Sequence, residues 1–270
     1  MADLGAREFY DSEYRSFQDA VSAAVRRAAF GEDIGQSSWL TAAEQRHFIS
    51  LMALDADSVV LDVACGSGGP ALFVAQEIGC EVTGIDLHPD GIAAAEASAR
   101  ERGLSERARF RVADIREGLP LADDTFDALQ CIDAMNHVYQ RARVLAEFRR
   151  VLRHGGRLLF TNPITVTGIL RREEMLVRSG GMGEFVFTAP GIDEVLLEAA
   201  GLVDVRREDV TANMAAVSSR WRAARADHSR ELSNLEGAET FSAIQEFLDV
   251  VATLATEGRL SRIVYVATKE

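Results

Sequence analysis

A glycine-rich loop, Gly66-Ser67-Gly68-Gly69-Pro70-Ala71, follows a short apolar run and precedes a helical stretch. Backbone amides at the start of a helix bind anionic groups, and glycine allows a ligand to approach the backbone closely. The spacing is G-x-G-x-x-A, and Asp86 lies 20 positions after Gly66, where an acidic residue can accept from ribose hydroxyls. The loop alone is therefore compatible with a nicotinamide dinucleotide.

Two further carboxylates favour a different ligand. Asp62 lies within the first predicted strand and would repel a pyrophosphate, whereas it would attract an ammonium or sulfonium group. Asp114 follows the third predicted strand, where it can accept from an exocyclic amine such as that of adenine. Either residue alone could be a solvated strand end, but their combination with Asp86 favours ligand binding.

Alternating strands and helices would position these residues. We predict strands over residues 58–64, 81–86, 108–112, 126–131 and 157–162. We predict helices over residues 70–78, 89–102 and 140–152, the last stopped by Gly155-Gly156. This alternation is typical of an α/β, doubly wound parallel sheet, whose ligands bind at the carboxyl ends of the strands.

The residues around the loop resemble the class I S-adenosylmethionine-dependent methyltransferases. The resemblance rests on Asp62-Val-Ala-Cys-Gly66-Ser-Gly68-Gly69, Gly84-Ile-Asp86, Ala113-Asp114, residues 119–127 and Arg150-Val-Leu-Arg-His-Gly-Gly156. It implies a Rossmann-like methyltransferase fold with seven strands, mostly parallel and with the last antiparallel. The remainder is similar to the small-molecule branch, near sarcosine-type and natural-product methyltransferases. One departure is Ala64, where many members have glycine, although alanine is small enough to keep close backbone approach.

The resemblance implies a site for S-adenosylmethionine, with S-adenosylhomocysteine as the product. At the methionine end, the amides of residues 66–69, which include Gly66 and Gly68, suit the carboxylate and Asp62 suits the ammonium. The loop Gly35-Gln36-Ser37-Ser38-Trp39 resembles the segment that folds over this end, so Gln36, Ser37 and Trp39 are candidates to contact it. An ordinary helix entry with Trp39 as a packing anchor is an equal alternative.

At the adenosine end, the resemblance assigns Asp86 to the ribose hydroxyls and Asp114 to the adenine amino group. The amide of Ile115 would face a ring nitrogen, and Leu87 would pack on the adenine face.

The segment Cys131-Ile-Asp133-Ala-Met-Asn-His137 leaves the sheet at the same edge. A helix there would place Asp133 and His137 on one face, because they are four positions apart. His137 could act as a general base, since the ordinary pKa of histidine is about 6.5. The alternative is a histidine that only packs near the cofactor, and we favour it slightly. Asp133 is a weaker candidate for the same pocket.

The flanking regions predict a cap and a lid around one continuous domain. We expect a helical cap over residues 1–54, a cofactor-binding core over 55–163, and completion of the sheet with helical lid insertions over 164–270. Thr41-Ala-Ala-Glu44 predicts a helix start in which Thr41 caps and Glu44 reaches back. Phe9, Tyr10 and Tyr14 either line the core or close over the cofactor. Two long helices, over 213–231 and 240–257, would select the substrate and could form a homodimer surface.

Composition limits the partners. The chain of 270 residues has 29 Lys plus Arg and 42 Asp plus Glu, a formal net charge of -13. This balance argues against nucleic acid, which needs a basic footprint. Three cysteines without metal spacing argue against disulfides and metal sites, and no segment is apolar enough for a membrane span. We therefore expect a cytoplasmic protein with a small-molecule partner.

The expected function is transfer of a methyl group from S-adenosylmethionine to a nitrogen or oxygen of a small-molecule metabolite or natural product, with carbon less favoured. Two alternatives stay open. The glycine spacing alone also suits a nicotinamide-dependent oxidoreductase, and the domain could bind S-adenosylmethionine without catalysis.

Overall fold

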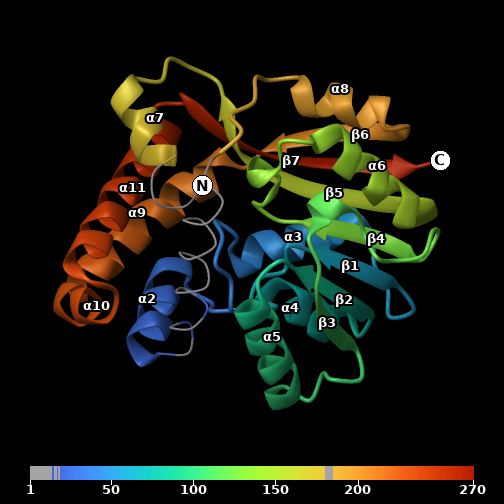
Figure 1. Ribbon diagram of the computed structural model, residues 1–270, viewed down its shortest axis with the longest axis horizontal. Helices are drawn as coiled ribbons and strands as arrows, with labels where there is room; N and C mark the ends of the chain where they lie inside the picture. Colours follow the sequence, from blue (N-terminus) through green and yellow to red (C-terminus); the bar gives the residue numbers. More distant parts are fainter. Residues whose placement is uncertain (1–13, 15–16, 18, 180–184) are drawn as a thin grey trace.

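The computed structural model describes residues 14, 17, 19–179 and 185–270. Its centre is a seven-stranded sheet in the order β3-β2-β1-β4-β5-β7-β6 (Figure 1). The first five strands are β1 (Val59–Val63), β2 (Glu81–Asp86), β3 (Ala108–Val112), β4 (Phe126–Cys131) and β5 (Leu152–Val166). These five are parallel, whereas β7 (Leu260–Lys269) is antiparallel to both β5 and β6 (Leu202–Asp209). The predicted doubly wound, mostly parallel sheet with an antiparallel last strand is confirmed.

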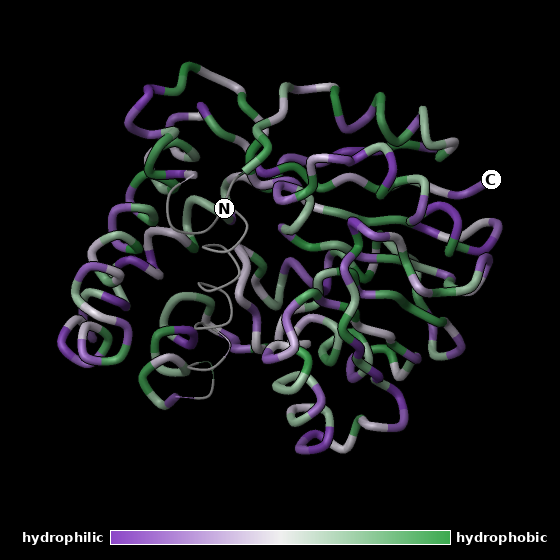
Figure 2. The backbone as a smooth tube through the Cα atoms, viewed as in Figure 1, coloured by the Kyte–Doolittle hydropathy of each residue, from purple (hydrophilic) through white to green (hydrophobic). Residues whose placement is uncertain are grey.

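Helices cover both faces of the sheet (Figure 1). One face packs on α3 (Ala42–Met52) and α4 (Gly69–Ile78), which contribute Phe48 and Phe73 to a buried cluster. The other packs on α6 (Arg141–Val151) and α8 (Ile192–Ala199), with Phe148 and Leu197 fully buried. The central strands β1 and β4 are buried along most of their length and mainly apolar (Figure 2), as expected for parallel strands covered on both sides. The helix α5 (Pro89–Glu101) packs beside β2 and β3.

A second group of helices stands beside the carboxyl edge of the sheet, on the left of Figure 1. It comprises α2 (Ala20–Phe30), α7 (Arg172–Ser179), α9 (Thr211–Asp227), α10 (Ser229–Glu236) and α11 (Ala238–Thr256). A buried cluster containing Phe30, Met214 and Phe247 joins α2, α9 and α11. We refer to α7, α9, α10 and α11 as the lid. Among the described residues, no helix is both long and apolar enough to cross a membrane.

Three expectations about these elements are wrong. The fifth strand was predicted over 157–162, whereas β5 begins at Leu152, directly after α6, because Leu152 already pairs with Phe126. The predicted helix over 213–231 ends at Asp227, and a separate helix, α10, follows it. The segment that leaves β4 is not an α-helix, since only Met135–His137 forms a single 3₁₀ turn, η2.

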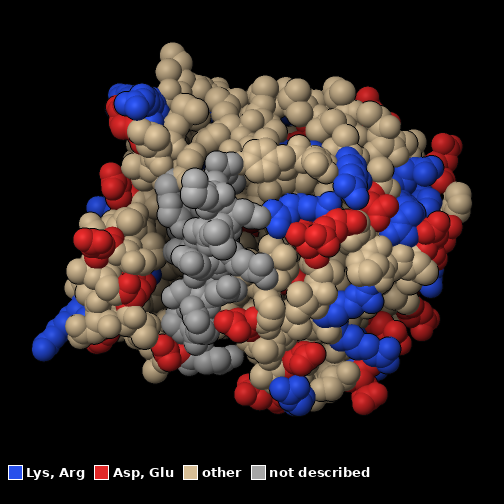
Figure 3. Space-filling model, in the orientation of Figure 1, with Lys and Arg blue, Asp and Glu red and all other residues tan. Residues whose placement is uncertain are grey.

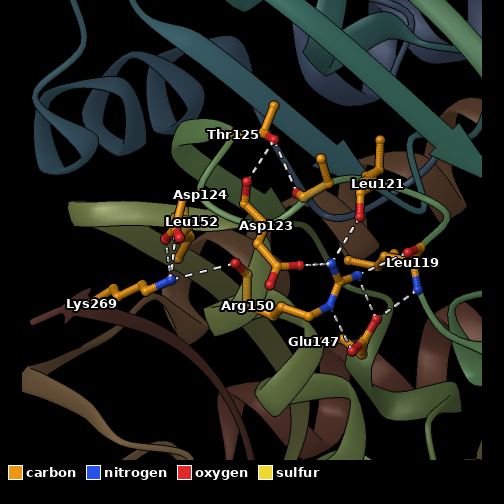
Figure 4. Close-up of polar contacts among 10 residues, drawn as sticks. Leu119, Leu121, Asp123, Asp124, Thr125, Glu147, Arg150, Leu152 and Lys269 are labelled. Carbon is orange, nitrogen blue, oxygen red and sulfur yellow. Dashed lines mark hydrogen bonds and ion pairs between the residues drawn. The ribbon is translucent and has the colours of Figure 1, made fainter.

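The motif residues after β3 have a structural role (Figure 4). The Arg150 guanidinium donates to the carbonyls of Leu119 and Leu121 at 2.9 and 2.8 Å and to the Asp123 carboxylate at 2.6 Å. On the other side of the same loop, the Lys269 ammonium donates to Asp124 at 2.6 Å. These contacts tie the loop before β4 to α6 and to β7. Residues 119–127 and Arg150, which carry part of the resemblance, therefore stabilise the sheet.

Candidate cofactor site

Backbone conformation shapes the glycine loop between β1 and α4. Gly66 and Gly68 have φ values of 55° and 78°, in the left-handed region that favours glycine. A Cβ on Gly68 would lie 2.6 Å from the Ala95 Cβ, so the loop also needs glycine to pack against α5. Ala64 has a φ of 59°, which explains why glycine suits this position and shows that alanine occupies it with some backbone strain.

Asp86 organises the loop from the end of β2. Its Oδ2 accepts from the Gly66 amide at 2.8 Å, and its Oδ1 accepts from the His88 amide at 2.9 Å. The Gly68 amide donates to the Cys65 carbonyl at 2.9 Å. The amides of Gly66 and Gly68 therefore bind within the loop. Of the four amides that we assigned to the carboxylate of the cofactor, those of Ser67 and Gly69 have no such contact among the described residues. The first turn of α4 holds no acidic residue, so the positive end of this helix keeps its attraction for an anion.

Asp62 is a buried carboxylate in β1. The residue is 2 % exposed, and its Oδ2 has no hydrogen-bond partner among the described residues. Burial raises the pKa of Asp62 to about 7; the Gln130 side chain opposes this shift, and the nearby charge of Asp86 adds to it. A buried carboxylate with an oxygen that lacks a partner is costly, and a bound ammonium group would supply both a donor and the opposite charge.

The residues assigned to adenosine lie at the ends of β2 and β3. Asp114 caps the 3₁₀ turn η1 (Ile115–Glu117), and its carboxylate accepts from the Arg116 amide at 2.9 Å. The Arg116 guanidinium also binds this carboxylate at 2.8 Å. Leu87 and Ile115 are half-buried. In this structure Asp114 is thus held in a fixed orientation by its own turn.

The loop before α3 lies against the glycine loop. A Cβ on Gly69 would come within 2.1 Å of the Gly35 carbonyl oxygen, which shows how closely the two backbones pack. Gln36 is fully buried, and its Oε1 accepts from the Ile34 amide at 2.9 Å. The Trp39 ring stacks on Phe247 of the lid, with centroids 6.2 Å apart. Gln36 thus shapes the loop and Trp39 joins it to the lid, while Ser37 is half-buried between them.

Tyr14 reaches the same place from the N-terminal segment. A Cβ on Gly66 would be 2.9 Å from the Tyr14 hydroxyl, and the Tyr14 and His88 rings are 5.7 Å apart. Tyr14 is buried and lies against the glycine loop, which is compatible with both interpretations of the N-terminal aromatics. Phe9 and Tyr10 lie outside the described residues.

Asp133 forms the centre of a buried ion network. Its Oδ2 accepts from the Trp39 amide at 3.0 Å, and its Oδ1 accepts from the fully buried Arg262 guanidinium at 2.8 Å. Arg262 also donates to Glu44 at 2.7 Å, and Asn213 of α9 donates to the same Glu44 oxygen at 3.0 Å. The network fixes the loop before α3 and the start of α9 to the sheet, and sequence analysis did not identify Arg262.

This network corrects the predicted capping box. Thr41 does cap α3, because its hydroxyl oxygen accepts from the Glu44 amide at 3.3 Å. The Glu44 side chain does not reach back, since Arg262 and Asn213 hold it. Burial raises the pKa of Glu44, and the positive charge of Arg262 opposes that shift.

His137 lies in η2 and faces the lid. Its ring centroid is 4.8 Å from that of Phe185, and the Arg178 guanidinium lies 4.8 Å from the centroids of both Phe185 and Phe247. Arg178 is 2 % exposed. These side chains form a continuous row between the end of β4 and Trp39, and Arg178 is a site candidate that sequence analysis missed.

Comparison with known proteins identifies the domain that this site belongs to. Residues 60–156 match the family described as "Methyltransferase domain". Methyltransferase GfsG of Streptomyces halstedii is 36 % identical over 157 residues, which cover 56 % of this chain and 55 % of that protein. The match thus spans about half the length of this curated relative.

Two solved structures share the fold over nearly the whole chain. The [4+2]-cyclase SpnF is 25 % identical, with a TM-score of 0.75, and the alignment covers 99 % of this chain and 96 % of that one. Phosphoethanolamine N-methyltransferase 2 of Haemonchus contortus, in complex with S-adenosyl-L-methionine, is 18 % identical with a TM-score of 0.80, covering 97 % and 60 %. Residues 60–156 therefore form a methyltransferase domain, and the chain as a whole is similar to S-adenosylmethionine-dependent methyltransferases in its glycine loop, strand-end carboxylates and seven-stranded sheet.

Proposed function

We propose that this protein transfers a methyl group from S-adenosylmethionine to a nitrogen or oxygen atom of a small molecule. The observation that carries the proposal is the buried carboxylate of Asp62 beside the glycine loop, whose Oδ2 has no hydrogen-bond partner among the described residues. A dinucleotide pyrophosphate would be repelled there, whereas an α-ammonium group would be stabilised. This carboxylate therefore argues against a nicotinamide-dependent oxidoreductase.

The residues around the loop suit each part of S-adenosylmethionine. Asp62 would hold the ammonium, and the amino end of α4 would hold the carboxylate. Asp86 keeps acceptor capacity for a ligand, because a carboxylate offers about four acceptor sites and the amides of Gly66, His88 and Leu87 use at most three. That remaining capacity suits the ribose hydroxyls, and Asp114, Ile115 and Leu87 suit the adenine.

The chain's own contribution to the reaction is positioning and exclusion of water. When bound, S-adenosylmethionine supplies an activated sulfonium methyl group for in-line transfer to the acceptor. The loop before α3, Tyr14 and the lid would hold the two reactants together. The row formed by His137, Phe185, Arg178 and Phe247 would line the acceptor side.

Replacing Asp86 by alanine tests the cofactor assignment. We expect the dissociation constant for S-adenosylhomocysteine, measured by isothermal titration calorimetry, to rise about 10- to 150-fold, which corresponds to about 1.5–3 kcal/mol for hydrogen bonds to a charged group. Glu81→Ala is the matched control, because Glu81 is an exposed carboxylate at the opposite end of the same strand. Equal affinity in the two variants would refute the assignment.

Replacing His137 by leucine tests how the acceptor is activated. We expect kcat to fall less than about tenfold, because His137 packs against Phe185 and its loss removes a contact rather than a proton acceptor. Rates are measured from pH 6 to 9 with S-adenosylmethionine and the best acceptor found by screening. A fall of about 10²- to 10⁴-fold together with loss of the neutral limb of the pH–rate profile would instead identify His137 as the general base.

A second candidate function is catalysis without methyl transfer. The observation that favours it is the likeness to the [4+2]-cyclase SpnF, which extends over 99 % of this chain. In this case S-adenosylmethionine would only stabilise the fold around the acceptor side. Tight binding of S-adenosylmethionine with no methyl transfer to any acceptor, and turnover of an uncyclised polyene instead, would favour the second candidate.

We also propose that the protein acts in the cytoplasm. All three cysteines are free and buried, which agrees with a reducing compartment.

A further inference from the structure

A cleft of about 540 Å³ opens between the amino ends of α6 and α8. Its walls are mainly apolar, from Tyr139, Val186, Phe187, Ile192 and Leu196, and its polar lining comprises Gln140, Arg141, Arg143 and Thr188. A cleft of this size, with apolar walls and few polar groups, is typical of small-molecule sites. Figure 3 shows few charged side chains on the surface above this region, between α7 and α8.

Arg141 places a buried guanidinium in the lining of the cleft. The residue is 4 % exposed, and its Nη1 donates to Asp193 at 2.5 Å. Its Nε and Nη2 are buried and have no hydrogen-bond partner among the described residues. These two nitrogens form one side of the planar guanidinium, where their parallel N–H groups match the two oxygens of a carboxylate.

The ion pair with Asp193 fixes the orientation of the Arg141 guanidinium. Asp193 is 1 % exposed, and its second oxygen accepts from Asn162 at 2.7 Å, so both of its oxygens already have partners. The ion pair therefore orients Arg141 without using its Nε and Nη2 atoms.

The helix that begins at Arg141 adds a second attraction. The Gln140 side chain does not cap α6, and the first turn of α6 holds no acidic residue, so its amino end has no negative side chain of its own to neutralise it. Ala142, in that turn, also lines the cleft. An anionic group there would meet both the helix terminus and the guanidinium.

We propose that this cleft binds an amphipathic carboxylate, with the carboxylate on Nε and Nη2 of Arg141 and the apolar body against Tyr139, Phe187 and Ile192. The site is separate from the proposed cofactor site and does not depend on methyl transfer. It adjoins the acceptor side, because Tyr139 and Val186 come directly after the segments that carry His137 and Phe185.

Calorimetry with three probes tests the two halves of the site. Decanoate carries both groups, acetate only the carboxylate and decan-1-ol only the chain, each used below its aggregation or solubility limit. We expect saturable binding of decanoate and at least tenfold weaker binding of the other two. Equal binding of decanoate and decan-1-ol, or no saturable binding of decanoate, would refute the proposal.

Three variants locate the binding site. Arg141→Lys keeps a cation for Asp193 but lacks the paired N–H groups, and Ile192→Asp places a charge on the apolar wall at a helix start that tolerates it. Each should weaken decanoate binding at least tenfold. Val195→Asp is the matched control, because Val195 is an exposed residue of the same helix that does not line the cleft.

Unchanged binding of S-adenosylhomocysteine in all three variants would show that each is folded and would keep this test separate from the proposed function. Wild-type affinity for decanoate in Arg141→Lys would contradict the proposal.

Discussion

Replacing Arg262 by methionine is expected to lower the free energy of unfolding by about 3–5 kcal/mol, because it removes a buried cation and leaves its anionic partners behind. Asp133 and Glu44 have side chains only 5 % and 8 % exposed, and both are bound to Arg262. Methionine fills a similar volume, so the loss reports the charge rather than a cavity. Urea denaturation at pH 7 measures the effect.

The effect of Arg262→Met should depend on pH. Without the cation, burial would raise the pKa of Glu44 further above that of the unfolded chain. The folded state then holds a proton that the unfolded state has released, so stability falls as pH rises above the unfolded value. The difference from wild type should therefore be larger at pH 8 than at pH 5.

Two controls isolate the network. Arg222→Met removes an exposed partner of Asp249, 51 % and 59 % exposed, and should cost less than about 1 kcal/mol. Adding Asp133→Asn and Glu44→Gln to Arg262→Met should recover part of the lost stability, because the orphaned charges are then gone. A loss below about 1 kcal/mol in Arg262→Met itself would mean that the network does not hold the lid to the sheet.

Replacing Asp62 by asparagine is expected to stabilise the free protein while weakening its affinity for the cofactor. Burial raises the pKa of Asp62 from 3.8 to about 7, and each unit corresponds to about 1.4 kcal/mol. Ionisation of Asp62 above pH 7 thus costs the folded state up to about 4 kcal/mol. Asparagine removes the charge but keeps a buried polar group, so we expect a gain of about 1–3 kcal/mol at pH 8.

The sign of the pH dependence distinguishes removal of a buried charge from other causes of a stability change in Asp62→Asn. Below about pH 4 Asp62 is protonated in both states, so the variant and the wild type differ little. Between pH 4 and 7 the folded wild type holds a proton that the unfolded chain has lost, and its stability falls as pH rises. Asp86 and Glu44, whose pKa values burial also raises, contribute a slope of the same sign in both proteins.

Cofactor binding should show the opposite trend. Wild-type affinity for S-adenosylhomocysteine should strengthen as pH rises through 7, because the carboxylate needed by the ammonium then forms. In Asp62→Asn the affinity should be at least tenfold weaker at pH 7.5 and should lack this rise. A variant that is less stable than wild type at pH 8 and binds the product equally well would contradict both the buried charge and its proposed partner.

Local patterns predicted most of the sheet. The ranges of β2, β3 and β4 agree with the predicted strands. The start of β5 was wrong because Leu152 pairs with Phe126, a contact that spacing along the chain cannot show. The break at His228 between α9 and α10 was missed because helical periodicity continues on both sides of it.

The site could be predicted only where its residues belong to one motif. The glycine loop and its strand-end carboxylates come from consecutive turns, so spacing was enough to bring them together. Arg262 binds Glu44, which lies 218 positions earlier, and nothing beside either residue indicates this contact. Arg178 lies in a charged stretch typical of a surface helix, and only the fold places it between two aromatic rings.

The position of β7 has a consequence for synthesis on the ribosome. This strand lies between β5 and β6 but is translated after both, so β6 has no neighbour in the sheet until residues 260–269 emerge. The β3-β2-β1-β4-β5 part can assemble earlier, whereas two strand edges remain open to mispairing with other chains. Arg262 and Lys269 both belong to β7 and arrive at the same moment. The part of the sheet that contains β6 is therefore completed in one late step, when residues 260–269 emerge.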